Sequence, residues 1–198
     1  MTPDDQEDHD DIQTTSGPRS ALVAVGVIAV LSVLLITVLA TRDPNVDRVT
    51  KSPLIGKLAP EVAGQTLDGE RFELSDQRGR WVVVNFFATW CIPCLAEHPE
   101  LAAFASAHEA AGDASVVSVL FDDKPDSARA VFEARGGDWP VVIDDDGKVS
   151  VSYGVARVPE SFLVAPDGTV VQRLVGGVTA AGLDDLLRAY LAAAEESR

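Results

Sequence analysis

A continuous apolar run leads directly into a Cys-x-x-Cys pair within Arg80–Cys94, and this arrangement constrains the fold more than any other feature. The run, RWVVVNFFAT, is rich in valine and phenylalanine and follows Gly79, which is typical of a strand buried on both faces. Such a strand belongs at the centre of a sheet that is covered by helices. A helix is expected from about Ile92 to His108, with Pro93 in the first turn, where its missing N–H costs no hydrogen bond.

The rest of the chain alternates strand and helix patterns. A turn at Asp68-Gly69 precedes a short alternating strand, and ASVVSVLFDD indicates a second buried strand. Further along we expect a helix over Asp126–Arg135 capped by Asp126 or Ser127, a short strand in WPVVIDDDG, a hairpin in SFLVAPDGTVVQRLVG and an amphipathic helix over Thr179–Ala194. This order predicts an α/β domain over residues 55–198, with a central mixed sheet and helices on both faces.

The N-terminal part differs in composition from this domain. Asp4 to Asp11 is acidic with no basic residue, which predicts a disordered tail over residues 1–20. Ala21–Ala40 contains no charged residue, and a helix of about 20 residues spans the hydrocarbon core of a membrane. We expect a transmembrane signal anchor there. A cleaved signal peptide is the alternative, although the run exceeds the usual apolar region of about 7–15 residues. Residues 41–54 are expected to form a juxtamembrane linker.

The two cysteines, Cys91 and Cys94, allow three roles. A structural disulfide that closes so short a loop would stabilise the fold little. Zinc would need two more ligands, and only His98 and His108 are available, on the same predicted helix, so we expect no metal. A redox pair fits best, because a helix N-terminus stabilises a thiolate and can lower a cysteine pKa from about 8.5 to roughly 3.5–7.5. Cys91 would then be the exposed nucleophile and Cys94 the resolving thiol.

Two segments, NFFATWCIPCLAEHP and SYGVARVPESFLVAPDG, resemble membrane-anchored thioredoxin-like thiol-disulfide oxidoreductases of cytochrome c maturation. The resemblance is to the CcmG/DsbE type, with the related ResA and TlpA types, and it covers roughly Ile55 to Ala194. It implies a thioredoxin-like fold, no cofactor, and a redox disulfide between Cys91 and Cys94.

The resemblance also implies roles for other residues. Pro159 matches a cis-proline that faces the cysteine pair, so the Val158 backbone would pair with an extended substrate. Glu97 and Glu160 match acidic residues near the active site, where a carboxylate can carry a thiol proton or tune its pKa. The remaining expectations are that Trp90 and Pro93 shape the rim, that His98 is structural, and that Asp122 and Asp123 only begin a loop.

The function expected from the resemblance is reduction of apocytochrome c cysteines, with a membrane electron donor of the CcdA/DsbD type. A general extracytoplasmic disulfide oxidase or exchanger and a non-catalytic peptide-binding module are the alternatives. A peroxidase is less favoured, because the chain has no cysteine apart from this pair. The net charge of −15 argues against nucleic-acid binding.

The charges around the apolar segment and the chemistry of the domain favour opposite orientations. Arg19 precedes the segment while Arg42, Arg48 and Lys51 follow it, so the positive-inside rule favours a cytoplasmic domain. Thiols become oxidised and need re-reduction outside the cytoplasm, and large domains translocate largely regardless of charge. We therefore expect a single-pass cell-membrane protein with a cytoplasmic N-terminus and an extracytoplasmic domain.

Overall fold

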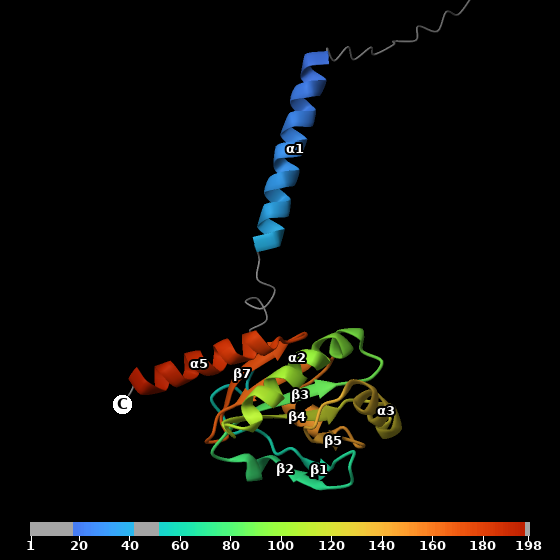
Figure 1. Ribbon diagram of the computed structural model, residues 1–198, viewed down its shortest axis with the longest axis vertical. Coiled ribbons are helices and arrows are strands. Elements are labelled where there is room, and N and C mark those ends of the chain that lie inside the picture. Colours follow the sequence, from blue (N-terminus) through green and yellow to red (C-terminus); the bar gives the residue numbers. More distant parts are fainter. Residues whose placement is uncertain (1–17, 42–51, 197–198) are drawn as a thin grey trace, which may run out of the picture. The chain divides into compact units, whose positions relative to one another are not determined.

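The computed structural model describes residues 18–41 and 52–196 (Figure 1). The chain divides into two units, Met1–Asp43 and Pro44–Arg198. Most of the expected acidic tail (residues 1–20) and of the expected linker (residues 41–54) lies outside the described residues.

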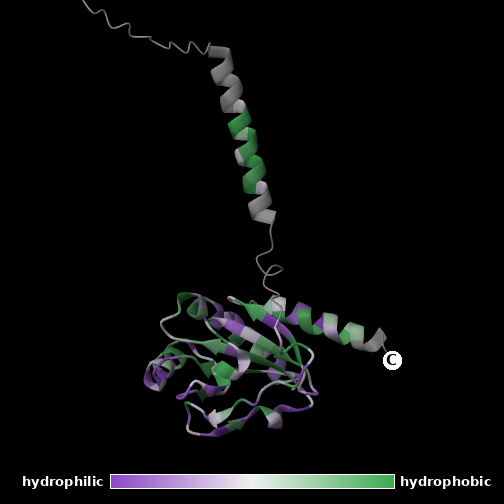
Figure 2. Cartoon of the chain, turned by 180° about the vertical axis from the view of Figure 1, so that it is seen from behind, coloured by the Kyte–Doolittle hydropathy of each residue, from purple (hydrophilic) through white to green (hydrophobic). Residues whose placement is uncertain are grey.

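The described residues of the first unit form the helix α1, over Pro18–Thr41. Its side chains are described over residues 26–37, and Figure 2 shows that most of them are hydrophobic. The large apolar side chains of this stretch, such as Val30 and Ile36, are more than half exposed. In the described part of the chain, no helix is long and apolar enough to cross a membrane. The anchor expected over Ala21–Ala40 extends beyond the described side chains and stays a prediction.

A five-stranded mixed sheet forms the centre of the second unit, in the order β5-β4-β3-β6-β7. Its strands are β3 (Trp81–Phe87), β4 (Ala114–Leu120), β5 (Val141–Ile143), β6 (Glu160–Val164) and β7 (Val170–Val175). β3 is parallel to β4 and antiparallel to β6, and each of its residues is buried. The apolar run before the cysteines is therefore the central strand, as its composition predicted.

Alternate residues of β3 contact different layers. Val83 packs with the helices α2 (Ile92–Glu109) and α5 (Ala180–Glu196), through side chains that include Leu101 and Leu183. Val84 belongs to the opposite cluster, which contains Tyr153 of the helix α4 (Lys148–Tyr153). The expectation of helices on both faces of a mixed sheet is confirmed.

Three local features differ from the sequence-based expectations. A two-stranded hairpin of β1 (Ala63–Gln65) and β2 (Arg71–Glu73) replaces the single expected strand, and the 3-10 turn η2 (Leu74–Gln77) follows it. The short helix α4 was not expected. The helix α3 (Pro125–Arg135) starts with proline after Lys124, so neither Asp126 nor Ser127 is its cap. Proline suits this first position because no partner for its nitrogen is needed there.

Candidate active site

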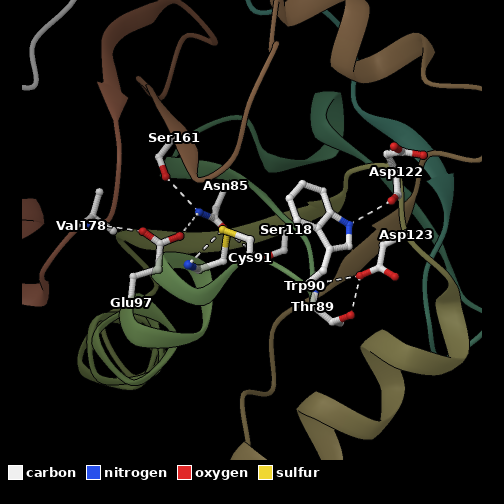
Figure 3. Close-up of a disulfide and its surroundings, with 11 residues drawn as sticks. Asn85, Thr89, Trp90, Cys91, Glu97, Ser118, Asp122, Asp123, Ser161 and Val178 are labelled. Atoms are coloured by element: carbon white, nitrogen blue, oxygen red, sulfur yellow. Dashed lines mark hydrogen bonds between the residues drawn. A yellow bond between two sulfur atoms is a disulfide. The ribbon is translucent and has the colours of Figure 1, made fainter.

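The two cysteines lie where β3 gives way to α2. Cys91 is the N-cap of α2, with extended backbone angles (φ −89°, ψ 104°), and its sulfur accepts a hydrogen bond from the N–H of Cys94 over 3.2 Å (Figure 3). Pro93 occupies the first turn. Cys91 and Cys94 form a disulfide, which confirms the expected pair. The sulfur of Cys91 therefore sits among the unpaired N–H groups that open a helix.

The burial of the two cysteines contradicts the expectation that Cys91 is exposed. Cys91 is 5% exposed and Cys94 3% exposed, so in the disulfide form both sulfur-bearing residues are buried and Cys91 is not the exposed partner. They pack in a cluster that includes Phe87 of β3 and Ala128 of α3. The adjacent Trp90 and Ile92 are 58% and 80% exposed and form an apolar rim. A substrate would therefore meet the rim before it meets the disulfide.

The turn before Cys91 is held by two residues that follow β4. The backbone N–H and the hydroxyl of Thr89 both donate to one carboxylate oxygen of Asp123, each over 2.6 Å. The Trp90 indole donates to the carbonyl of Asp122, whose φ of 44° is the only positive value at a non-glycine residue in the described part of the chain (Figure 3). Burial opposes ionisation of Asp123, but the bonds from Thr89 outweigh it and lower its pKa.

The expectation that Asp122 and Asp123 only begin a loop is therefore wrong. A signal for their role was present in the sequence, because β3 and β4 are parallel neighbours whose C-terminal ends share one edge of the sheet. The acidic pair that follows β4 therefore lies next to the cysteine-containing turn that follows β3. The pairing of the two strands had to be known before this proximity could be inferred.

Glu97 lies on α2 after the two cysteines, and its side chain is buried and not exposed at the surface. It is 3% exposed, and one carboxylate oxygen accepts from the Asn85 amide over 2.9 Å. The other oxygen accepts from the backbone N–H of Val178, also over 2.9 Å (Figure 3). Since Glu97 lies three residues after Cys94 on the same helix, the two residues are neighbours on one helix face.

Asn85 was not recognised from the sequence as a site residue. It is 1% exposed and lies in register with Ser118 of β4 and Ser161 of β6, so three polar residues form a row across the centre of the sheet. The signal was a single amide within an otherwise apolar strand, since a buried polar group needs hydrogen-bond partners.

The Val158–Pro159 peptide bond is cis, as expected. Val158 packs against the cluster that contains both cysteines, which places this loop at the site. The carbonyl of Pro159 accepts from Gly176 over 2.9 Å, whereas the backbone groups of Val158 have no hydrogen-bond partner within the described residues.

Glu160 and His98 have structural surroundings. Glu160 is 1% exposed and forms an ion pair with Arg173 of β7. The His98 ring bonds the carbonyl of Gly136 and packs against Phe132. Burial lowers the pKa of His98, which keeps the ring neutral near pH 7. A catalytic role for Glu160 stays a prediction, while the structural role of His98 agrees with its contacts.

The site contains little that would hold a metal ion. Within the described residues, no group of three or more histidine, cysteine or acidic side chains is placed to hold one. The chemistry available at this place is that of the cysteine pair itself, with Glu97 as a nearby buried carboxyl group.

Comparison with known proteins gives concordant results. Residues 55–173 match the AhpC/TSA family. The chain is 33% identical over 134 residues to the thiol-disulfide oxidoreductase ResA of Bacillus thuringiensis (strain Al Hakam), covering 68% of this chain and 77% of the relative. It is 36% identical over 103 residues to the thiol:disulfide interchange protein CycY of Rhizobium leguminosarum bv. viciae, covering 52% and 53% of the two chains.

A solved structure agrees with these relatives. A Chlorobium tepidum protein described as a thiol:disulfide interchange protein DsbE superposes with a TM-score of 0.60 at 30% identity. The superposition covers 74% of this chain and 97% of the Chlorobium chain. The α/β domain therefore has a thioredoxin-like fold.

Proposed function

Because the chain belongs to the AhpC/TSA family and is a thiol-disulfide oxidoreductase of the ResA/CcmG type, we propose that it reduces the disulfide of apocytochrome c before haem is attached. The substrate segment would be the oxidised Cys-x-x-Cys-His haem-binding motif. The observation that carries the proposal is the Cys91–Cys94 disulfide at the N-cap of α2. The substrate class is supported by the resemblance of the two active-site segments to cytochrome c maturation proteins.

The proposed reaction has two exchange steps. The Cys91 thiolate attacks one substrate sulfur, a Cys91–substrate disulfide forms, and the other substrate sulfur leaves as a thiolate that takes up a proton. Cys94 then loses its proton and attacks the Cys91 sulfur, which closes the Cys91–Cys94 disulfide and releases the second substrate sulfur as a thiol. Two electrons pass from the dithiol to the substrate, which gains two protons.

Glu97 is the proposed proton acceptor for Cys94. It is the buried carboxyl group next to Cys94 on α2, and its two oxygens accept from N–H groups of Asn85 and Val178, contacts that suit an ionised carboxylate. In the second step the Cys94 proton passes to Glu97 and then to the departing substrate sulfur. Glu160 would act less directly, since its carboxylate pairs with Arg173.

The backbone groups of Val158, which are unpaired within the part of the chain that the structure describes, and the exposed rim would hold the substrate. An extended peptide can pair with Val158 in the manner of an added strand. The apolar rim of Trp90 and Ile92, together with the exposed Pro93 between them and Cys94, would cover the substrate cysteine that reacts. A peptide held in this way would bring its own disulfide directly above the buried sulfurs of Cys91 and Cys94. Specificity would then come from side chains next to the substrate cysteines.

We further propose that the protein is a single-pass membrane protein, anchored by Ala21–Ala40, with its N-terminus in the cytoplasm and its domain outside. The proposal is supported by the absence of charge in this segment and by the need for a reductant where thiols become oxidised. A membrane electron donor of the CcdA/DsbD type would return the Cys91–Cys94 disulfide to the dithiol.

Trapping tests the proposed substrate. A reduced Cys94→Ala variant should accumulate a mixed disulfide with a synthetic peptide that carries an oxidised Cys-x-x-Cys-His motif, detected by mass spectrometry. A Cys91→Ser variant is the control and should form none. Equal trapping of a scrambled peptide that lacks the histidine would contradict the substrate class while leaving the exchange chemistry intact.

The reduction potential separates a reductant from the alternative oxidase. For a two-electron couple, about 30 mV corresponds to about 1.4 kcal/mol. Equilibration with glutathione should give a potential nearer that of thioredoxin (about −270 mV) than that of a strong oxidant such as DsbA (about −120 mV). A value near the latter would favour the oxidase.

Labelling in intact cells tests the orientation. A membrane-impermeant maleimide should modify reduced Cys91 without lysis, and lysed cells provide the total as a control. If only lysed cells become labelled, the domain lies in the cytoplasm.

A further inference from the structure

The buried polar row across β4, β3 and β6 joins an aromatic side chain outside the sheet to the proposed proton acceptor. The Trp139 indole N–H lies 2.8 Å from the Ser118 hydroxyl oxygen, and that hydroxyl lies 3.3 Å from the Asn85 amide oxygen. The Asn85 amide nitrogen is 2.9 Å from Glu97 and 3.1 Å from the Ser161 hydroxyl. Asn85, Ser118 and Ser161 are each at most 1% exposed, so the row is shielded from water.

The direction of this hydrogen-bond chain is fixed at both ends. An indole nitrogen can only donate, and an ionised carboxylate can only accept. Because Trp139 donates to the oxygen of Ser118, the Ser118 hydrogen is directed to the Asn85 oxygen. The Asn85 nitrogen must then face Glu97 (Figure 3). Reversing any one of these hydrogen bonds would leave a buried donor or acceptor without a partner, which is costly.

We infer that Asn85 is a positioning residue for the redox reaction: its amide, oriented by Ser118 and Trp139, holds the Glu97 carboxylate where it receives the Cys94 proton. The inference rests on the proposed function, because it deepens the role given there to Glu97. When Cys94 attacks Cys91, the proton leaves the Cys94 sulfur for Glu97, and the substrate sulfur departs with the electron pair of the broken bond.

The other ionisable groups around Glu97 have partners elsewhere. His98, the next residue of α2, bonds Gly136, and Glu160 pairs with Arg173 on β7. Farther along α2, Glu100 accepts from the backbone N–H of Ala180, and His108 bonds Asp113 and Asp184. Arg135 of α3 donates to the carbonyl of Leu95 on α2. Comparison of the pH profile of disulfide closure with that of Glu97→Gln therefore separates the titration of Glu97 from that of these groups.

The test is a double-mutant cycle on the closing step. The full-length reduced protein is mixed rapidly with the oxidised Cys-x-x-Cys-His peptide, and release of the second substrate thiol is followed between pH 5 and 9. Asn85→Leu should slow closure at pH 7 by roughly tenfold, because a hydrogen bond to a charged group is lost, and should move the pH midpoint of closure upward. In a Glu97→Gln background the same Asn85→Leu change should have no further effect.

Two further variants control for general damage. Ser161→Ala removes a buried hydroxyl that also bonds Asn85 but lies off the path to Glu97, so the midpoint should stay unchanged. Trp139→Phe removes the donor at the start of the path and should shift the midpoint in the same direction as Asn85→Leu, by a smaller amount. Trp139→Phe keeps the inference testable if Asn85→Leu fails to fold, which urea unfolding would reveal.

The outcomes separate this inference from the proposed function. If Asn85→Leu slows closure equally in both backgrounds, or if Ser161→Ala shifts the midpoint as Trp139→Phe does, Asn85 does not act through Glu97 and the inference fails alone. If Glu97→Gln itself leaves closure and its pH profile unchanged, the proton-accepting step of the proposed function fails, and the inference fails with it.

Discussion

The backbone N–H of Cys94 donates to the sulfur of Cys91 over 3.2 Å, so the first turn of α2 binds the atom that is proposed to attack the substrate. The bond is made in the disulfide form, and a thiolate would accept it more strongly because charged acceptors form the stronger hydrogen bonds. The other N–H groups and the dipole of α2 act in the same direction. The geometry therefore favours charge on Cys91 rather than on Cys94.

Loss of the Asp123 carboxylate should loosen the turn before Cys91. Asp123→Ala removes the acceptor of both Thr89 bonds, and we expect a loss of about 1–3 kcal/mol in the free energy of unfolding, measured with urea. Asp126→Ala is the control, since that side chain is 95% exposed and should matter little. Equal effects of the two variants would contradict a specific role for Asp123.

The contribution of Asp123 should depend on pH in a defined direction. Its pKa is lowered in the folded state, so it stabilises the fold above the unfolded value of about 3.9, and this stabilisation is lost as the pH falls through the folded value. The stability difference between wild type and Asp123→Ala should be constant from pH 6 to 8 and shrink below about pH 4. A difference that grows on acidification would show that the sign is wrong.

His108 should have the opposite pH dependence. Its two ring nitrogens bond Asp113 over 2.8 Å and Asp184 of α5 over 3.0 Å. Burial opposes the charge, but the bonds to Asp184 and Asp113 outweigh it and raise the pKa of His108. The stabilisation is therefore complete below the unfolded value of about 6.5 and lost as the pH rises through the folded value.

The comparison of wild type with His108→Gln tests this ion-pair cluster. Wild type should be the more stable at pH 5.5, and the difference in unfolding free energy should shrink by pH 8.5. NMR titration of the ring should give a midpoint above 6.5, and Asp184→Asn should move that midpoint down. A midpoint at or below 6.5 would contradict the contacts.

The Glu160–Arg173 pair should matter for stability more than for chemistry. Glu160→Ala leaves Arg173 without its partner, and breaking a buried pair costs about 3–5 kcal/mol of unfolding free energy. Replacing both residues, as in Glu160→Leu with Arg173→Met, should recover much of that loss. If the double variant is stable yet reduces disulfides far more slowly than wild type, Glu160 takes part in the reaction as the family resemblance implied.

The sequence predicted the central features of the domain because they depend on local patterns. The apolar composition of β3 and the position of Pro93 were enough to place a buried strand and a helix on either side of Cys91. The hairpin of β6 and β7 followed from its Pro-Asp-Gly turn. Each of these elements is specified by neighbouring residues along the chain.

The missed features depend on contacts between distant strands. Asn85 and Ser161 are 76 positions apart, and Thr89 and Asp123 are 34 apart, so their proximity follows only from the strand order. The short helix α4 was missed because its six residues, KVSVSY, alternate polar and apolar side chains, which is the period of a strand and not of a helix. The burial of Glu97 was likewise invisible along the chain, since the N–H of Val178 that binds it lies 81 positions away.

The acidity of the Cys91 thiol provides the most direct test. In a Cys94→Ala variant only this thiol remains, and its rate of alkylation by iodoacetamide can be followed from pH 4 to 10. Stabilisation by the start of α2 predicts a pKa below about 7.5. A pKa near the ordinary value of about 8.5 would show that the helix does not activate this sulfur.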